Sequence, residues 1–183
     1  MLPVKCVTLG DGCAGKTSIL RLYADNFLLD EYPPTVCEEY LAHATTSNGT
    51  SVMLRLCDTA GLNIRPFFYV DTEILLLCFS VADPNSLENI RLRWLPEIKH
   101  YCPNVPLILV GTKIDLRRHR HSKCLSLEQG MDLAKKIKAL EYMECSARSG
   151  LGVKEIFQVA ASSAMERRTN DNGKNSSRKC CLM

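Results

Sequence analysis

Gly10-Asp11-Gly12-Cys13-Ala14-Gly15-Lys16-Thr17 is the stretch that decides the fold of this 183-residue chain. It matches the pattern G-x-x-x-x-G-K-[ST] of a phosphate-binding loop. Its glycines let the backbone wind tightly and bring N–H groups close to phosphate oxygens. Lys16 supplies a full positive charge for the β- and γ-phosphates, and the Thr17 hydroxyl can bind Mg²⁺.

The residues on either side of this loop support the same interpretation. Residues 4–9 are apolar enough for a buried strand, and residues 18–23 have the pattern of an amphipathic helix. Such a helix would point its positive end at the bound anion. The alternative is a Gly-rich turn that binds nothing, and the order of strand, loop and helix argues against it.

Strands and helices alternate along the rest of the chain. We expect strands near residues 3–9, 38–46, 51–57, 74–81, 105–110 and 141–145. We expect helices near residues 16–24, 84–102, 126–139 and 153–168. Further signals are caps at Ser86 and Ser126, a bend or a shifted helix boundary at Pro96, and a hairpin turn at Asn48-Gly49. This alternation predicts an α/β fold with a mostly parallel sheet that is covered on both faces.

Composition is typical of one soluble domain followed by a tail. The chain is 46% hydrophobic and 23% charged, and the net charge of +3 is too small to indicate a nucleic-acid partner. No apolar run has the length of a signal peptide or a membrane span. The ten cysteines show no metal-ligand spacing, so we expect reduced thiols. We place the domain at residues 1–166 and a flexible, basic tail at 167–183.

Three more motifs begin where predicted strands end, which is where open α/β sheets bind ligands. Asp58 can hold Mg²⁺ through water, and the Gly61 N–H can reach a γ-phosphate. Asp115, in Thr112-Lys113-Ile114-Asp115, can accept two hydrogen bonds from the N1–H and N2–H₂ edge of guanine. Adenine lacks that donor pair and would leave the carboxylate unpaired. The Ala147 N–H, after Ser146, can face guanine O6.

Together these motifs resemble the Ras superfamily of small GTPases, and within it the Rho family, especially its Rac-like members. The resemblance covers essentially the whole chain, and its carrying stretches are residues 5–7, 10–17, 32–36, 58–61, 94–103, 111–116 and 142–147. It implies a P-loop NTPase fold, the small G-domain, with a six-stranded, mostly parallel sheet and helices on both faces. Thr112 stands where Ras itself has Asn, although Thr is usual in Rho-like proteins.

The resemblance also implies specific contacts with GTP or GDP and Mg²⁺. The implied nucleotide contacts are Gly10, Asp11, Gly12, Cys13, Ala14, Gly15, Lys16, Thr17, Ser18, Thr35, Asp58, Gly61, Thr112, Lys113, Asp115, Ser146 and Ala147. Thr17, Thr35 and Asp58 would hold the metal, and Lys16, Thr35 and Gly61 would act in hydrolysis. Loop 25–37 corresponds to switch I and the loop after Gly61 to switch II, which order around GTP and relax after hydrolysis.

Partners follow from the same resemblance. Effector proteins would dock on the effector loop, which comprises Tyr32, Pro33, Pro34, Thr35, Val36, Cys37, Glu38, Glu39 and Tyr40. Exchange factors and GTPase-activating proteins are also expected, with altered recognition, and the protein should act as a monomer. The output implied by the family is the actin cytoskeleton, polarity or membrane traffic.

The last four residues, Cys180-Cys181-Leu182-Met183, match C-a-a-X, with Cys180 as the prenylated residue and a terminal Met that favours farnesyl. One prenyl chain anchors weakly, so a second signal is expected. The basic residues of the tail can supply it; they are Arg167, Arg168, Lys174, Arg178 and Lys179. We therefore expect the protein at the cytoplasmic face of the plasma membrane or of endomembranes, with a cytosolic pool.

The residue after Gly61 departs from the family. Leu62 stands where the family has a Gln that orients the attacking water, and Leu cannot hydrogen-bond. Slow intrinsic hydrolysis is the resulting hypothesis, unless Asn63 takes over. The main reading is a prenylated switch that hydrolyses GTP slowly. The alternative is a permanently GTP-loaded module that binds effectors without useful hydrolysis. A P-loop kinase is disfavoured, because no Arg-rich lid is visible and Asp115 indicates guanine.

Four further departures concern recognition. Switch II is short and apolar over residues 64–70, which either pack on the core or form a partner surface. Either Phe27 or Leu28 covers the guanine, and Leu28 would release nucleotide faster. The Rho insert is reduced to the basic loop Arg117–Lys123, which we interpret as solvated rather than membrane-bound. Cys57 replaces a Trp that precedes the motif Asp in Rac-like proteins, so exchange-factor choice is altered.

Overall fold

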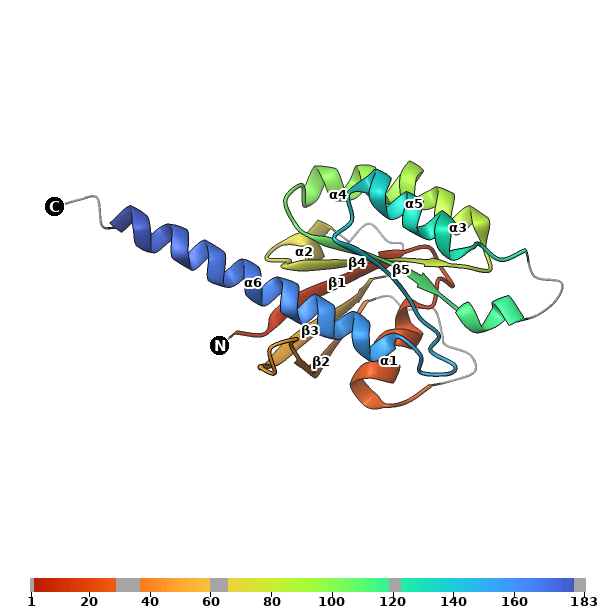
Figure 1. Cartoon of the computed structure of the whole chain (residues 1–183), viewed down its shortest axis with the longest axis horizontal. Helices are drawn as coiled ribbons and strands as arrows, with labels where there is room; N and C mark the ends of the chain where they lie inside the picture. The colour runs from red at the N-terminus through yellow and green to blue at the C-terminus, as the bar shows by residue number, and fades with distance from the viewer. Residues whose placement is uncertain (1, 29–36, 60–65, 119–122, 180–183) are drawn as a thin grey trace.

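A single sheet organises the molecule. The computed structural model describes residues 2–28, 37–59, 66–118 and 123–179. Within these residues six strands form one sheet in the order β2-β3-β1-β4-β5-β6 (Figure 1). The strands are β1 (Val4–Gly10), β2 (Cys37–Thr45), β3 (Ser51–Thr59), β4 (Ile74–Ser80), β5 (Leu107–Thr112) and β6 (Glu141–Glu144). β2 runs antiparallel to β3 and the other neighbours are parallel, which confirms the predicted α/β class.

Helices cover both faces of this sheet (Figure 1). They are α1 (Lys16–Asp25), α2 (Pro66–Tyr69), α3 (Pro84–Asn89), η1 (Ile90–Trp94), α4 (Leu95–Tyr101), η2 (Ile114–Arg118), α5 (Leu127–Ile137) and α6 (Val153–Lys179). α1 and α6 pack on one face, and η1, α4 and α5 pack on the other.

The central strand β4 shows why two layers of helices are needed. All seven of its residues are buried. Because successive side chains point to opposite faces, Ile74, Leu76 and Cys78 join the core under α1 and α6. Leu75, Leu77 and Phe79 join the core under η1, α4 and α5. A strand that is apolar on both faces is stable only between two layers.

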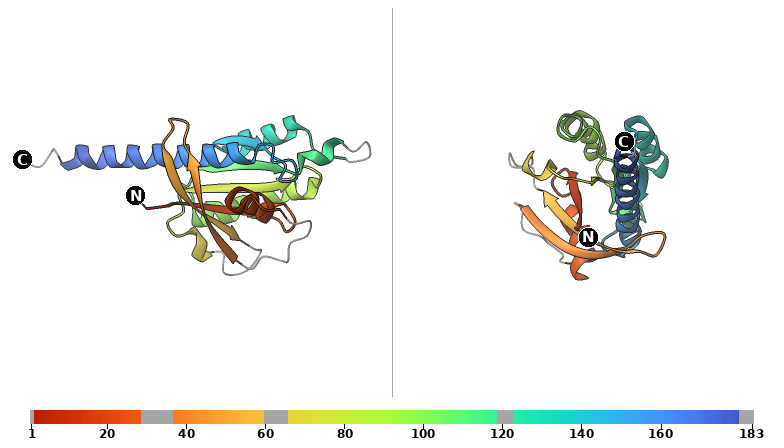
Figure 2. Two further views of the ribbon diagram at one scale, coloured as in Figure 1. Left: turned by 90° about the horizontal axis from the view of Figure 1, so that it is seen from below. Right: turned by 90° about the vertical axis from the view of Figure 1, so that its left-hand side faces the viewer.

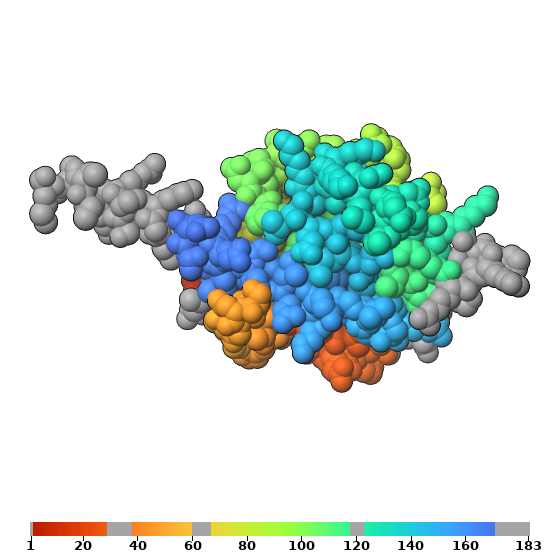
Figure 3. Space-filling view, viewed as in Figure 1, coloured from red at the N-terminus to blue at the C-terminus, as the bar shows by residue number. Residues whose placement is uncertain are grey.

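The hairpin between β2 and β3 forms as the Asn48-Gly49 pair predicts. Gly49 has a φ of 83°, a left-handed conformation that glycine adopts without strain. The Thr46 N–H donates to the Thr50 carbonyl at 2.9 Å and closes the turn. The turn is also held against α6, because the Ser47 N–H donates to Ser162 Oγ at 2.9 Å. Figure 3 shows the hairpin and α6 side by side on this face of the molecule.

The helix predicted over residues 84–102 is interrupted by a wide turn. η1 is π-helical, and the Leu95 N–H donates to the Ile90 carbonyl five residues earlier. Pro96 follows directly; it has no N–H to donate, and its ring crowds the carbonyl four residues before it. Of the two effects that the sequence predicts for Pro96, the structure has the boundary, since Pro96 lies in the first turn of α4 directly after the widened turn.

The start of this helical segment corrects one prediction. Asp83, not Ser86, caps α3, since its side chain accepts a hydrogen bond from the Asn85 N–H at 3.1 Å. The Ser86 hydroxyl is buried and ties α3 to β4 by accepting from the Ser80 N–H at 3.0 Å. The other predicted cap is confirmed. Ser126 caps α5, and Gln129 returns the hydrogen bond in a capping box.

The last helix runs further than predicted. The sequence predicts an irregular tail from residue 167, but the backbone is helical to Lys179 and α6 extends well beyond the sheet (Figure 2). Arg168 anchors the helix where it leaves the body. Its guanidinium donates to Glu73 Oε2 at 2.5 Å and to the Leu2 carbonyl at 2.9 Å. No helix among the described residues is long and apolar enough to cross a membrane.

The cysteines that the structure describes are free thiols: Cys6, Cys13, Cys57, Cys78, Cys102, Cys124 and Cys145. This agrees with the expectation of reduced thiols. Burial raises the pKa of the Cys57 and Cys78 thiols to about 12, so both stay protonated and inert at neutral pH.

Candidate nucleotide-binding site

The phosphate-binding loop lies between the end of β1 and the start of α1, as predicted. Gly10 has a φ of 138°, and a Cβ there would lie 2.1 Å from the Cys78 carbonyl oxygen on β4. Only glycine therefore lets β1 approach β4 at this point. Gly15 has a φ of 81° and forms the N-cap of α1, so the chain turns left-handed immediately before the helix. The positive end of α1 thus faces the loop.

Lys16 lies folded over the loop. Its ammonium group donates to the carbonyl oxygens of Gly10 at 2.9 Å and Asp11 at 2.8 Å. Burial lowers its pKa, while the nearby acidic groups of Cys78, Asp58 and Asp11 act in the opposite direction. A buried, loop-bound ammonium is well placed to meet an anion that the loop encloses.

The side chains of Thr17 and Asp58 meet, although the two residues are 41 positions apart in the chain. Asp58 is buried near the end of β3, and its Oδ2 accepts a hydrogen bond from the Thr17 hydroxyl on α1. A hydroxyl and a carboxylate are hard oxygen ligands of the kind Mg²⁺ prefers. The pair therefore fits a Mg²⁺ ion, which would neutralise charge on phosphate oxygens when bound. Thr35 and Gly61, the other predicted residues of this end, lie outside the described residues.

The predicted base-binding segments also meet. The Ser146 hydroxyl donates to Asp115 Oδ1 at 2.6 Å, which joins the loop after β5 to the loop after β6. Main-chain bonds reinforce this contact: the Ile114 N–H donates to the Cys145 carbonyl at 3.3 Å. The carboxylate of Asp115 is thereby oriented, and Ala147 follows directly after Ser146 in the same loop.

Thr112 connects the two halves of the site. It is buried, and its hydroxyl donates to the Ala14 carbonyl of the phosphate loop at 2.6 Å. A Cβ on Gly15 would lie 3.4 Å from the Thr112 hydroxyl oxygen and 3.8 Å from Lys113 Cε. The base loop therefore abuts the phosphate loop. Thr112 contacts the phosphate loop directly and would influence a bound nucleotide through it.

The geometry is that of one site along the carboxyl edge of the parallel strands, with a phosphate end and a base end. Comparison with protein families agrees: the model of the Ras family matches residues 5–166. The chain belongs to the Ras family. It is accordingly a small GTPase, a molecular switch that binds guanine nucleotide, and its fold is a small G-domain.

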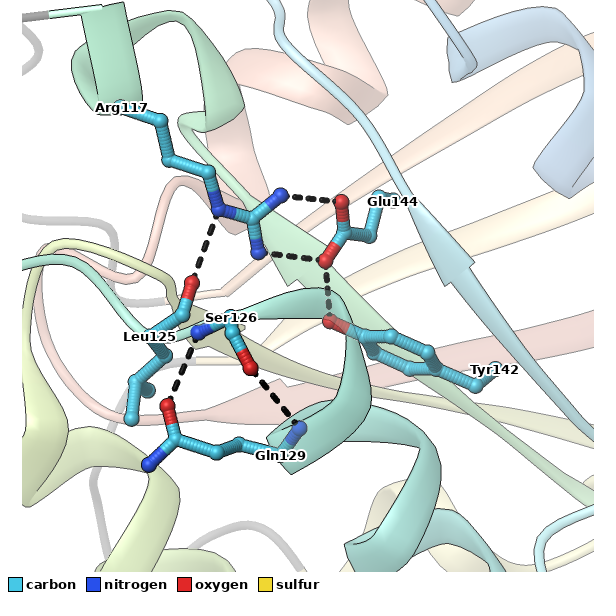
Figure 4. A network of polar contacts seen from close by, with 6 residues as sticks. All are labelled: Arg117, Leu125, Ser126, Gln129, Tyr142 and Glu144. Atoms are coloured by element: carbon cyan, nitrogen blue, oxygen red, sulfur yellow. Dashed lines mark hydrogen bonds and ion pairs between the residues drawn. The ribbon is translucent and has the colours of Figure 1, made fainter.

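In this Ras-family chain an ion pair between Arg117 and Glu144, here called the brace, joins the two base loops. The sequence analysis does not predict it. Arg117 Nη2 donates to Glu144 Oε1 at 2.6 Å, and a second nitrogen of the same guanidinium contacts the other carboxylate oxygen (Figure 4). The Tyr142 hydroxyl also donates to Glu144 Oε1, at 2.6 Å. Arg117 Nε donates to the Leu125 carbonyl at 2.8 Å, which ties Arg117 to the residue before the Ser126 cap of α5.

The brace corrects the interpretation of Arg117 as part of a solvated basic loop. Arg117 lies two residues after Asp115, and Glu144 two residues before Ser146, a symmetry that could have suggested the pair. Glycines make room for Tyr142, because a Cβ on Gly130 would lie 2.1 Å from its ring. Burial raises the pKa of Tyr142, so its hydroxyl remains a donor. Residues 119–122 of the basic loop lie outside the described residues.

The effector loop is described from Cys37 onward, and residues 32–36 lie outside the described part. Glu38 accepts hydrogen bonds from Arg21 Nη2 on α1, at 2.8 Å, and from the Tyr40 hydroxyl. Arg21 Nε donates to the same Tyr40 hydroxyl at 3.0 Å. These bonds lower the pKa of Glu38, with the Tyr40 hydrogen bond as the largest cause. Glu38 and Tyr40 therefore fasten β2 to α1, while Glu39 is exposed.

The apolar switch II stretch is divided between the core and the surface. Tyr69 is 6% exposed, stacks on Tyr101 and donates its hydroxyl to Glu97 at 2.5 Å. Phe67 and Val70 are 78% and 62% exposed. The core alternative thus holds for Tyr69, and in part for Phe68, which packs against the same core. Phe67 and Val70 face solvent, and the partner surface stays a prediction. Residues 60–65, including Leu62, lie outside the described residues.

Phe27 and Leu28 follow the end of α1, after Asn26 turns left-handed with a φ of 52°. They are 50% and 38% exposed, so neither is absorbed into the core. Both side chains therefore remain candidates to cover a guanine base.

Proposed function

We propose that this Ras-family protein is a Rho-like, Rac-like switch that binds GTP and GDP together with Mg²⁺ and hydrolyses GTP slowly. The contact between Thr17 and Asp58 carries the proposal, because it joins a phosphate-loop hydroxyl to a buried carboxylate at the point where a phosphate-bound cation would sit. The Asp115–Ser146 hydrogen bond supports the guanine end of the same site. The Rho-like subtype rests on the sequence motifs, such as Thr112 in the base loop and the stretch 94–103.

Slow hydrolysis is proposed from Leu62. Positioning the attacking water needs a side chain that can donate and accept hydrogen bonds, and Leu has neither capacity. The second candidate function applies if hydrolysis is slow enough for GTP to stay bound. The protein is then a GTP-loaded module that binds effectors through residues 32–40. Leu62 is the observation that favours this alternative.

Membrane attachment is proposed from the pattern at residues 180–183, with Cys180 as the prenylated residue and the cytoplasmic face of a membrane as the site of action. Arg168 contributes less to a basic membrane signal than its sequence position suggests, since its guanidinium is bound to Glu73 and to the Leu2 and Pro3 carbonyls. Arg167 also donates within the protein, to the Asn104 carbonyl, and the other basic residues of the proposed signal are Lys174, Arg178 and Lys179.

The test is to identify the nucleotide that co-purifies with the full chain by chromatography after denaturation. Bound GDP indicates a cycling switch, and bound GTP indicates the hydrolysis-deficient module. A protein that carries no guanine nucleotide and binds none in the presence of Mg²⁺ would contradict both.

A further inference from the structure

Both oxygens of the Asp11 carboxylate are bound by the helical segment that covers the other side of the sheet. Asn89 Nδ2 donates to Asp11 Oδ2 at 2.6 Å, and Trp94 Nε1 donates to Asp11 Oδ1 at 2.8 Å. Both carboxylate oxygens thus accept a hydrogen bond from one helical segment. The donors are 78 and 83 residues away along the chain, and Trp94 is fully buried.

The π-helical turn is what brings these two donors together. Asn89 and Trp94 are five residues apart, and in an α-helix of 3.6 residues per turn they would point about 140° apart. In a π-helical turn the backbone hydrogen bond joins residues i and i+5, so two such residues lie much nearer to one face than they would in an α-helix. η1 spans Ile90–Trp94, between α3 and Pro96. A proline that disfavours the regular helix therefore aligns Asn89 and Trp94 on the face that meets the phosphate loop.

Lys16 is the reason that the position of this carboxylate matters. Its ammonium lies 2.8 Å from the main-chain oxygen of Asp11. A carboxylate released on the same residue could rotate to form an ion pair with that ammonium. Such a pair would neutralise the charge that the loop offers to phosphate and would add a negative charge beside it. Two donors that satisfy both carboxylate oxygens prevent this, since hydrogen bonds to an ionised acceptor are stronger than neutral ones.

We propose that Asn89 and Trp94 are positioning residues for the phosphate loop. They keep the Asp11 carboxylate out of an ion pair with Lys16, so that Lys16 stays available for phosphate, and they thereby prolong the retention of bound nucleotide. This inference rests on the proposed function at the same site and extends it to control of nucleotide retention by the α3–η1–α4 segment, acting through Asp11.

The experiment measures release of a fluorescent GDP analogue from the full chain in Mg²⁺. Asn89→Ala removes one donor, and Trp94→Phe removes the indole N–H while keeping a large ring. Each should accelerate release about tenfold, the value of one hydrogen bond to a charged group. Asn85→Ala, on the exposed side of the same helix, is the matched control and should release at the wild-type rate.

A rescue separates this role from simple structural support. In Asn89→Ala with Asp11→Asn, the side chain at position 11 is neutral and cannot form an ion pair with Lys16. Release should then slow again toward the wild-type rate, although the hydrogen bond from position 89 is still missing. If Asn89→Ala and Trp94→Phe release GDP at the wild-type rate, or if Asp11→Asn makes release faster still, the positioning role is wrong. Failure of the wild-type protein to bind the GDP analogue would instead refute the proposed function.

Discussion

Arg117 and Glu144 form a two-pronged ion pair that joins the segments following β5 and β6. Arg117 Nη2 lies 2.6 Å from Glu144 Oε1. Asp115 and Ser146 lie on the same two segments and hydrogen-bond to each other. The ion pair therefore acts as a brace behind the residues that would recognise guanine.

Arg117→Met should weaken this brace. The substitution keeps an unbranched side chain but leaves the largely buried Glu144 without its cation. We expect a loss of about 1–3 kcal/mol in unfolding free energy and faster GDP release. Urea denaturation and fluorescent-nucleotide release measure the two effects. Lys123→Ala, on the exposed part of the same connection, should change neither, and an unaffected release rate in Arg117→Met would separate the brace from base binding.

Leu62→Gln should accelerate GTP hydrolysis. A Gln at this position restores a side chain that can orient water, and we expect at least about a tenfold faster single-turnover rate. Leu62→Met lacks hydrogen-bonding capacity and serves as the matched control. Equal rates in the wild type and Leu62→Gln would mean that another residue already positions the water.

Thr17→Val and Asp58→Asn should both uncouple nucleotide retention from Mg²⁺. Each removes or weakens one of the two oxygen groups that meet in the structure and are proposed to hold the metal. In the wild type, EDTA should speed GDP release strongly; in the variants, release should already be fast in Mg²⁺ and EDTA should add little. Thr45→Ala, exposed on β2, should retain the wild-type response to EDTA. A full EDTA response in both variants would place the metal elsewhere.

Glu38→Gln should reveal a pH-dependent contribution to stability. Hydrogen bonds from Tyr40 and Arg21 lower the pKa of Glu38 below its ordinary value of 4.5. A carboxylate with a depressed pKa stabilises the folded protein above the unfolded-state pKa, and that stability is lost as the pH falls through the folded-state pKa. The wild type should therefore exceed Glu38→Gln by less than about 1 kcal/mol at pH 7, since the pair is partly exposed.

Denaturation series between pH 7 and pH 3 measure this difference for Glu38→Gln. The gap between wild type and variant should shrink as the pH falls below 4.5. Glu39→Gln, on the exposed side of the same strand, is the control. A gap that is constant over this range would contradict the contribution of the charge.

Arg168→Ala should reduce stability more than it reduces membrane affinity. Arg168 donates to both carboxylate oxygens of Glu73 and to two main-chain carbonyls near the N-terminus. We expect a loss of about 1–3 kcal/mol in unfolding free energy. Binding of the lipidated protein to anionic vesicles should change less than it does in Lys174→Ala with Arg178→Ala. Lys154→Ala, exposed on the same helix, controls for the loss of one charge.

The sequence by itself determined the fold class and the ends of the nucleotide site. Gly10–Thr17, Asp115 and Ser146 lie where strands end or just after them, and Asp58 lies near the end of β3; parallel strands bring their carboxyl ends to one edge. Local chemistry was equally informative at the Asn48-Gly49 turn and at the Ser126 cap, because such signals involve residues a few positions apart. The end of the last helix was predicted less well, since polar composition indicates little about whether a helix continues past its last buried turn.

Only the tertiary structure decided which side chains support that site. Trp94 reaches Asp11 across 83 residues, Arg117 reaches Glu144 across 27, and Arg168 reaches Glu73 across 95. Such contacts depend on how layers pack and on the register of each helix, and no local pattern encodes them. The π-helical turn before Pro96 is the clearest case. The sequence indicates that a regular helix is disturbed there, but only the packing of that helix against the phosphate loop decides that Asn89 and Trp94 meet Asp11.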